Sequence, residues 1–122
     1  MAVLAPQARL SDDERRVLHT WLTRLRQEIE LDAVWLFGSR ARGEAGGEDS
    51  DVDLLVITRG DPGKDRHRVW ALVDEAADEL GADPTVFVPH VRDRAWLDDR
   101  RRIDSFFIQE VDRDRVILFE RS

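Results

Sequence analysis

The chain has 122 residues, which is enough for one compact domain and too few for two ordinary ones, so we expect a single domain over 1–122. It contains no cysteine and begins with no signal-peptide or membrane-helix pattern, which excludes disulfides and thiolate metal sites and predicts a cytoplasmic protein. The net charge of -7 argues against sequence-independent nucleic-acid binding, because such binding needs many basic contacts to phosphate.

The first half of the chain is predicted to hold an amphipathic helix and two buried strands. Residues 11–14, Ser-Asp-Asp-Glu, form a capping box, and the apolar residues that follow keep helical spacing to about residue 30. Residues 33–37 and 52–58 are apolar runs typical of buried strands. Between them, a polar segment has room for one or two helical turns before Gly46 and Gly47.

The second half is predicted to hold a long helix, two short helices and two strands. Residues 61–62, Asp-Pro, fit a helix start, and an apolar stripe leads from there to Gly81. Residues 85–88 have the pattern of a third strand, which Pro89 is expected to end. Two short helices and a last strand are expected over 93–100, 105–111 and 115–119. This order of elements is typical of an α/β or α+β domain.

Several aromatic residues and histidines have structural interpretations. Three tryptophans fit apolar faces and are predicted to pack in the core: Trp21, Trp35 and Trp70. Three histidines share no metal-ligand spacing and are interpreted as surface or partly buried residues: His19, His67 and His90.

Two aspartates stand at the start of the second predicted strand. Side chains alternate between the faces of a strand, so Asp51 and Asp53 are expected to project to the same side. Adjacent carboxylates repel each other unless a cation lies between them, and hard oxygen ligands suit Mg²⁺ completed by water and substrate phosphate. The spacing therefore predicts a magnesium site.

The end of the first predicted strand supplies groups suited to phosphate. Gly38 allows the backbone to approach a ligand closely, and Ser39 adds a hydroxyl donor. Arg42, and with less weight Arg40, are placed to neutralise a triphosphate. Asp83, ahead of the third strand, is the candidate third acid, which would complete the metal site or take a proton from an attacking hydroxyl. Together these parts indicate phosphoryl-type transfer.

The stretch FGSRARGEAGGEDSDVDLLV resembles the signature of the nucleotidyltransferase fold shared with DNA polymerase beta, and most closely that of the small minimal nucleotidyltransferases. The resemblance implies a mixed sheet of about four strands flanked by helices. It also implies nucleotide-binding roles for Gly38 and Ser39, and two Mg²⁺ ions held by Asp51, Asp53 and Asp83. The chain departs from the common pattern in a slightly longer loop at 46–48 and in Pro84, which directly follows the third acid.

The same resemblance implies transfer of AMP from ATP to a hydroxyl. Many minimal nucleotidyltransferases are antitoxins that bind a HEPN-domain RNase toxin, and some inactivate it by adding AMP to a tyrosine. This chain has no tyrosine, so a tyrosine acceptor has to belong to the partner. Two alternatives stay open: a non-catalytic module that blocks its toxin by complex formation, and transfer to a small molecule such as an aminoglycoside.

Overall fold

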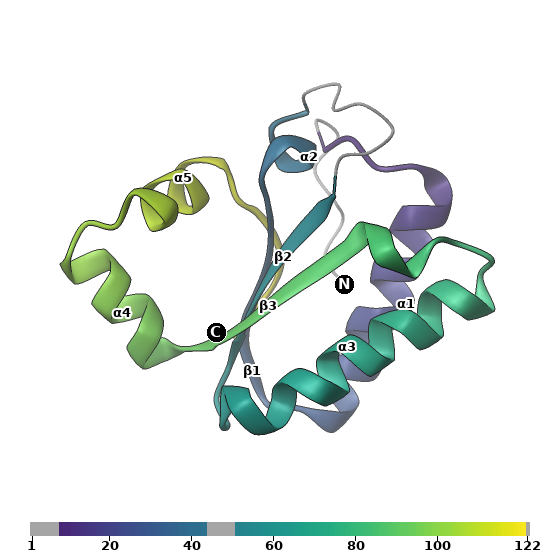
Figure 1. Ribbon diagram of the computed structural model, residues 1–122, viewed down its shortest axis with the longest axis horizontal. Coiled ribbons are helices and arrows are strands. Elements are labelled where there is room, and N and C mark those ends of the chain that lie inside the picture. The colour runs from purple at the N-terminus through teal and green to yellow at the C-terminus, as the bar shows by residue number, and fades with distance from the viewer. Residues whose placement is uncertain (1–7, 44–50, 122) are drawn as a thin grey trace.

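The computed structural model describes residues 8–43 and 51–121, which form one four-stranded sheet with helices against both faces (Figure 1). The strands are β1 (Leu31–Phe37), β2 (Val52–Thr58), β3 (Phe87–Asp93) and β4 (Val116–Glu120). Their order across the sheet is β3-β2-β1-β4. β1 runs antiparallel to β2 and β4, whereas β2 and β3 are parallel. The predicted fold class, with a mixed sheet of about four strands, is confirmed.

The helices form a layer on each side of the sheet. α1 (Asp12–Glu28) and α3 (Pro62–Glu79) lie together on one face, and α4 (Arg94–Arg102) and α5 (Phe106–Asp114) lie on the other (Figure 1). The short α2 (Ser39–Arg42) follows β1, and the 3₁₀ turn η1 (Pro84–Val86) precedes β3. Over the described ranges, no helix has the length and apolar character needed to cross a membrane.

Alternation along the strands divides the core into two clusters. One face of β2 places Val52, Leu54 and Val56 in the larger cluster with α1 and α3. The other face places Leu55 and Ile57 in a smaller cluster with α4 and α5. Because helices cover both faces, β2 reads as an almost continuous apolar run, and Asp53 is the exception that needs an explanation.

The capping box at the start of α1 forms as predicted. The Ser11 hydroxyl accepts a hydrogen bond from the Glu14 N–H at 3.0 Å, and the Ser11 N–H donates to the Glu14 carboxylate at 2.8 Å. Trp21, fully buried on this helix, donates its indole N–H to the Val69 carbonyl of α3 at 3.2 Å. α1 and α3 are therefore joined by a polar contact as well as by apolar packing.

Two predictions about the fold are wrong. Pro89 does not end the third strand, because β3 is an edge strand of the described sheet and a proline there need not donate a hydrogen bond outward. β3 therefore runs on past Pro89 to Asp93. It also starts two residues later than expected, at Phe87. Trp70 is 37% exposed on α3 and is not a core residue, whereas Trp21 and Trp35 are buried.

Candidate active site

Gly38 and Asp53 are in direct contact where β1 ends beside β2. Phe37 and Asp53 are partners in the antiparallel register, so the chain leaves β1 immediately next to the Asp53 carboxylate. Gly38 has φ +82° and ψ -163°, a conformation that is essentially restricted to glycine. A Cβ added to Gly38 would lie 2.8 Å from the Asp53 Oδ2. Glycine is thus needed at this position for two reasons: other residues rarely adopt these backbone angles, and the Asp53 carboxylate occupies the space that a Cβ would fill.

A pocket of about 370 Å³ opens beside this contact. One wall comes from the β1–α2 junction and β2, with Phe37, Gly38, Ser39, Arg42 and Asp53. The other wall comes from α5 and its end, with Phe107, Glu110, Val111 and Asp114. Four of the residues singled out in the sequence therefore gather around one cavity: Gly38, Ser39, Arg42 and Asp53.

Asp51 is exposed and directly precedes β2. Val52, between the two aspartates, is fully buried in the larger core cluster. Alternation along β2 directs the Asp53 carboxylate away from that core and toward the pocket, whereas Asp51 is not among the residues that line the pocket. The glycine-rich part of the loop before Asp51, with Gly46, Gly47 and Glu48, falls outside the described residues.

The two arginines of α2 have different surroundings. Arg42 lines the pocket and forms an ion pair with Asp114, at 3.3 Å. Hydrogen bonds from Arg113, and then from Arg42, hold the pKa of the Asp114 carboxyl below its usual value, so this carboxylate is ionised at neutral pH and paired with two guanidinium groups. Arg40 instead donates to the Glu14 carboxylate of α1 through its two terminal guanidinium nitrogens, at 2.8 and 3.3 Å. Arg40 thereby ties α2 to α1.

The structure does not bring Asp83 into the pocket. Its carboxylate accepts hydrogen bonds from the Thr85 N–H at 2.9 Å and the Thr85 hydroxyl at 2.7 Å, and it caps η1. These bonds, the side-chain bond first, lower the pKa of the Asp83 carboxyl. Pro84 opens this turn, so β3 begins only at Phe87 and Asp83 stays in the connection after α3. The candidate third acid is thus engaged in the turn before β3 and is not among the residues that line the pocket.

Sequence reasoning missed His90 on β3 and the wall formed by α5. The His90 Nε2 lies 4.0 Å from the Asp53 Oδ1, and its ring packs against Phe37 with centroids 5.6 Å apart. His90 is partly buried, in agreement with the interpretation drawn from its lack of metal-ligand spacing, but that spacing says nothing about its place beside Asp53. Continuing the strand alternation through Pro89 would have placed His90 on the same face as Val88, whose register partner is Asp53.

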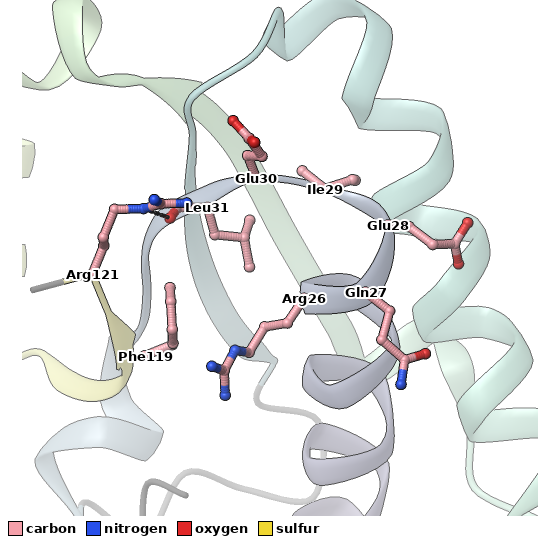
Figure 2. Close-up of a pocket in the computed structure, with 8 residues that line it drawn as sticks. All are labelled: Arg26, Gln27, Glu28, Ile29, Glu30, Leu31, Phe119 and Arg121. Atoms are coloured by element: carbon pink, nitrogen blue, oxygen red, sulfur yellow. Dashed lines mark hydrogen bonds between the residues drawn. The ribbon is translucent and has the colours of Figure 1, made fainter.

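Two further hollows lie between α1 and β4. One, of about 260 Å³, is bounded by the end of α1, the start of β1, Phe119 and Arg121 (Figure 2). Its basic groups are already engaged, because the Arg26 guanidinium lies 4.5 Å from the Phe119 ring centroid and Arg121 donates to the Leu31 carbonyl at 3.2 Å. Its neighbour, of about 370 Å³, shares Arg26 and Phe119. Neither contains a residue of the Gly-Ser or Asp-x-Asp motif.

The profile of the nucleotidyltransferase domain family matches residues 19–120, and the chain belongs to this family. A crystal structure of a candidate nucleotidyltransferase from Sulfolobus solfataricus is similar to the chain, with 15% identity and a TM-score of 0.48. That similarity covers 93% of this chain and 91% of the Sulfolobus chain. No curated protein sequence matches the chain.

Proteins of this family generally use a divalent metal ion with a nucleoside triphosphate, and the residues present fit such an ion. Among the described residues, no donor hydrogen-bonds to the Asp53 carboxylate, which is only 31% exposed and has the His90 Nε2 at 4.0 Å. Over the described ranges, no three carboxylate or imidazole side chains lie close enough together to form a complete metal site. One or two carboxylates completed by substrate phosphate and water are, however, the usual way in which proteins hold Mg²⁺.

Proposed function

We propose that the protein is a Mg²⁺-dependent nucleotidyltransferase that moves AMP from ATP to a hydroxyl of a partner protein. The observation that carries the proposal is the contact of Gly38 with Asp53, next to Ser39 and Arg42, in a chain that belongs to the nucleotidyltransferase domain family. This arrangement puts a phosphate-binding turn and a metal-binding carboxylate on one pocket. Bound there, the ions neutralise phosphate charge and activate the α-phosphate.

In the proposed reaction the acceptor oxygen forms a bond to the α-phosphorus of ATP. The bond from that phosphorus to its bridging oxygen breaks, pyrophosphate leaves, and the hydroxyl proton passes to water or to a nearby base. Ser39 and Arg42 hold the phosphates in line, and Asp51 and Asp53 hold the ions. Asp83 has no part in this step, because its carboxylate caps η1.

We further propose that the acceptor is a tyrosine of a HEPN-type RNase toxin and that the protein acts as its antitoxin. The resemblance to the minimal nucleotidyltransferases supports this partner. The absence of tyrosine from the chain is consistent with modification of another protein rather than of itself. Such a reaction takes place in the cytoplasm, where ATP, Mg²⁺ and an RNase toxin are all present.

The test combines purified protein, Mg²⁺ and α-labelled ATP with the product of a neighbouring HEPN-type gene, or with host extract, and measures AMP on protein by intact mass. Wild type should label one acceptor, and Asp51→Ala/Asp53→Ala should not. Asp74→Ala/Asp78→Ala is the matched control, because it removes two exposed carboxylates from α3, on the opposite face of the sheet. Transfer that survives in Asp51→Ala/Asp53→Ala would contradict the proposed mechanism.

A second candidate is a non-catalytic module that blocks its toxin by complex formation. It is favoured by the placement of Asp83 away from the pocket and by the net charge of -7, which is complementary to a basic RNase groove. In that case Asp51→Ala/Asp53→Ala would neutralise the toxin as well as wild type does, and no label would appear.

A further inference from the structure

His90 and Asp53 lie on the same face of two neighbouring parallel strands. In the β2–β3 register Asp53 is opposite Val88, and Leu55 is opposite His90. Asp53 and Leu55 share a face by alternation, so the His90 side chain emerges on that face. It lies two residues along β3 from Val88, the register partner of Asp53. The closest approach of the two side chains is 4.0 Å, between the His90 Nε2 and the Asp53 Oδ1.

Aromatic packing sets the direction of the His90 ring. Phe37 of β1 lies 5.6 Å from it, centroid to centroid, with 51° between the ring planes. Phe37 is itself held edge-to-face by Phe107 of α5, at 5.4 Å. The side chains of His90 and Asp53 are 35% and 31% exposed, so both reach solvent while the remainder of each side chain is covered by protein. The imidazole is therefore oriented toward the carboxylate rather than free on the surface.

No other acid takes this position among the described residues. Asp83, the expected third carboxylate, is occupied in capping η1. Across the described ranges, Asp53 carries the only carboxylate that lies within 4.0 Å of a His90 ring nitrogen. A nitrogen ligand thus stands where the proposed metal site lacks a further oxygen ligand.

We propose that the His90 Nε2 binds the same divalent ion as Asp53, and that this site therefore prefers Mn²⁺ or another first-row ion to Mg²⁺. The inference rests on the proposed function, because it assigns one more ligand to the same site. Neighbouring ligand atoms of an octahedral ion are about 3 Å apart when each lies about 2.1 Å from the ion. The Nε2 and Oδ1 atoms are 4.0 Å apart, so small side-chain rotations that move them about 1 Å closer reach that separation.

The chemistry of the ligands decides the preference between ions. Mg²⁺ takes oxygen ligands almost entirely, whereas an imidazole nitrogen raises affinity for first-row transition ions. A set of Asp51, Asp53 and His90 combines both kinds of donor. Exchanging the imidazole for a carboxylate should return the site to an oxygen set and to Mg²⁺.

The experiment uses pulsed electron paramagnetic resonance on the untagged protein with Mn²⁺ and ATP. We expect hyperfine coupling from a protein nitrogen to the bound Mn²⁺ in wild type, and loss of that coupling in His90→Asn. His67→Asn is the matched control, because His67 is exposed on α3, on the opposite side of the sheet. Circular dichroism and melting temperature establish that each variant is folded.

The outcomes separate this inference from the proposed function. Mn²⁺ that binds in an Asp53-dependent way without nitrogen coupling, or with coupling that persists in His90→Asn, would overturn the role of His90 and leave the two-carboxylate site standing. Absence of Asp53-dependent Mn²⁺ binding would overturn both.

Competition between the two ions gives a second test, which measures relative affinity and does not depend on hyperfine coupling. Titration of Mg²⁺ against Mn²⁺ should show that His90→Asn loses at least about tenfold in Mn²⁺ affinity, with little change for Mg²⁺. His90→Asp should shift the preference toward Mg²⁺. An unchanged ratio of the two affinities in both variants would contradict the proposed ligand.

Discussion

Gly38 is the residue at which backbone conformation and site chemistry depend on each other most closely. Its positive φ turns the chain out of β1, and its missing Cβ leaves room for the Asp53 carboxylate. A side chain at this position would strain the backbone and displace the carboxylate that is expected to hold the ion.

Gly38→Ala should therefore lower the free energy of unfolding by about 1–3 kcal/mol and also abolish nucleotide transfer. Gly81→Ala is the matched control, since Gly81 has φ +70° but no atom within 4 Å of an added Cβ. It should lose stability and keep transfer. Urea unfolding and the labelling assay measure the two effects. If both variants lost transfer equally, the contact with Asp53 would have no special role.

At the scale of elements, the site depends on how α2 is held against α1. The Arg40–Glu14 pair joins them, with side chains only 12% and 17% exposed. Burial raises the pKa of Glu14, but hydrogen bonds from Arg40 and Ser11 and the charge of Arg40 outweigh it and hold that pKa below its usual value. The carboxylate is thus ionised in the folded protein at neutral pH.

A lowered folded-state pKa makes the contribution of Glu14 to stability depend on pH. It is fully present above the unfolded pKa of about 4.3 and is lost as pH falls through the lower folded value. Arg40→Gln should cost roughly 1–2 kcal/mol at pH 7, and the difference from wild type should shrink as pH falls below about 4.

The matched control for this prediction is Arg68→Gln. Arg68 binds Glu28 through two nitrogens in the same way, at 2.8 and 3.0 Å, but on an exposed surface. Its loss should cost less at pH 7. Urea unfolding of both variants between pH 7 and pH 3 makes the comparison. A difference between wild type and Arg40→Gln that stays constant over this range would show that the Glu14 pair does not titrate with folding.

Elements also show what could be predicted from the sequence. The capping box, the Asp-Pro helix start and the Gly-Ser to Asp-x-Asp spacing are local signals, and the elements they predict are present. The error at β3 arose because a proline ends a strand only where its nitrogen has to donate, and the sequence does not say which strand is at the edge. The same boundary hides the place of His90 on β3, beside the register partner of Asp53.

At the scale of the whole molecule, the two helical layers have different tasks. α1 and α3 cover the face of the sheet that forms the larger core cluster. α4 and α5 cover the other face, and α5 supplies a wall of the pocket (Figure 1). This wall could not be read from the sequence, because it depends on how the last helices return over the sheet.

Val111→Ala and Val73→Ala distinguish a role in the pocket from a role in the core. Both valines are buried, at 1% and 0% exposure, but Val111 lines the pocket from α5 and Val73 packs from α3. Each change should cost about 1–3 kcal/mol of stability. Only Val111→Ala should also raise the KM for ATP, which steady-state labelling measures. An equal change of KM in both variants would indicate a general loss of stability rather than a role for the α5 wall.

The pocket as a whole sets a strict electrostatic condition on nucleotide binding. Asp53 and Glu110 line it, and the Arg42 guanidinium is already paired with Asp114, so we expect a triphosphate to bind here only together with a cation. The central claim is therefore tested most directly by calorimetric titration of ATP into wild type and Asp53→Asn, with a divalent ion and with a chelator. We predict binding only by wild type and only with the ion. Binding of equal strength with the chelator or by Asp53→Asn, or no binding under any condition, would contradict the account.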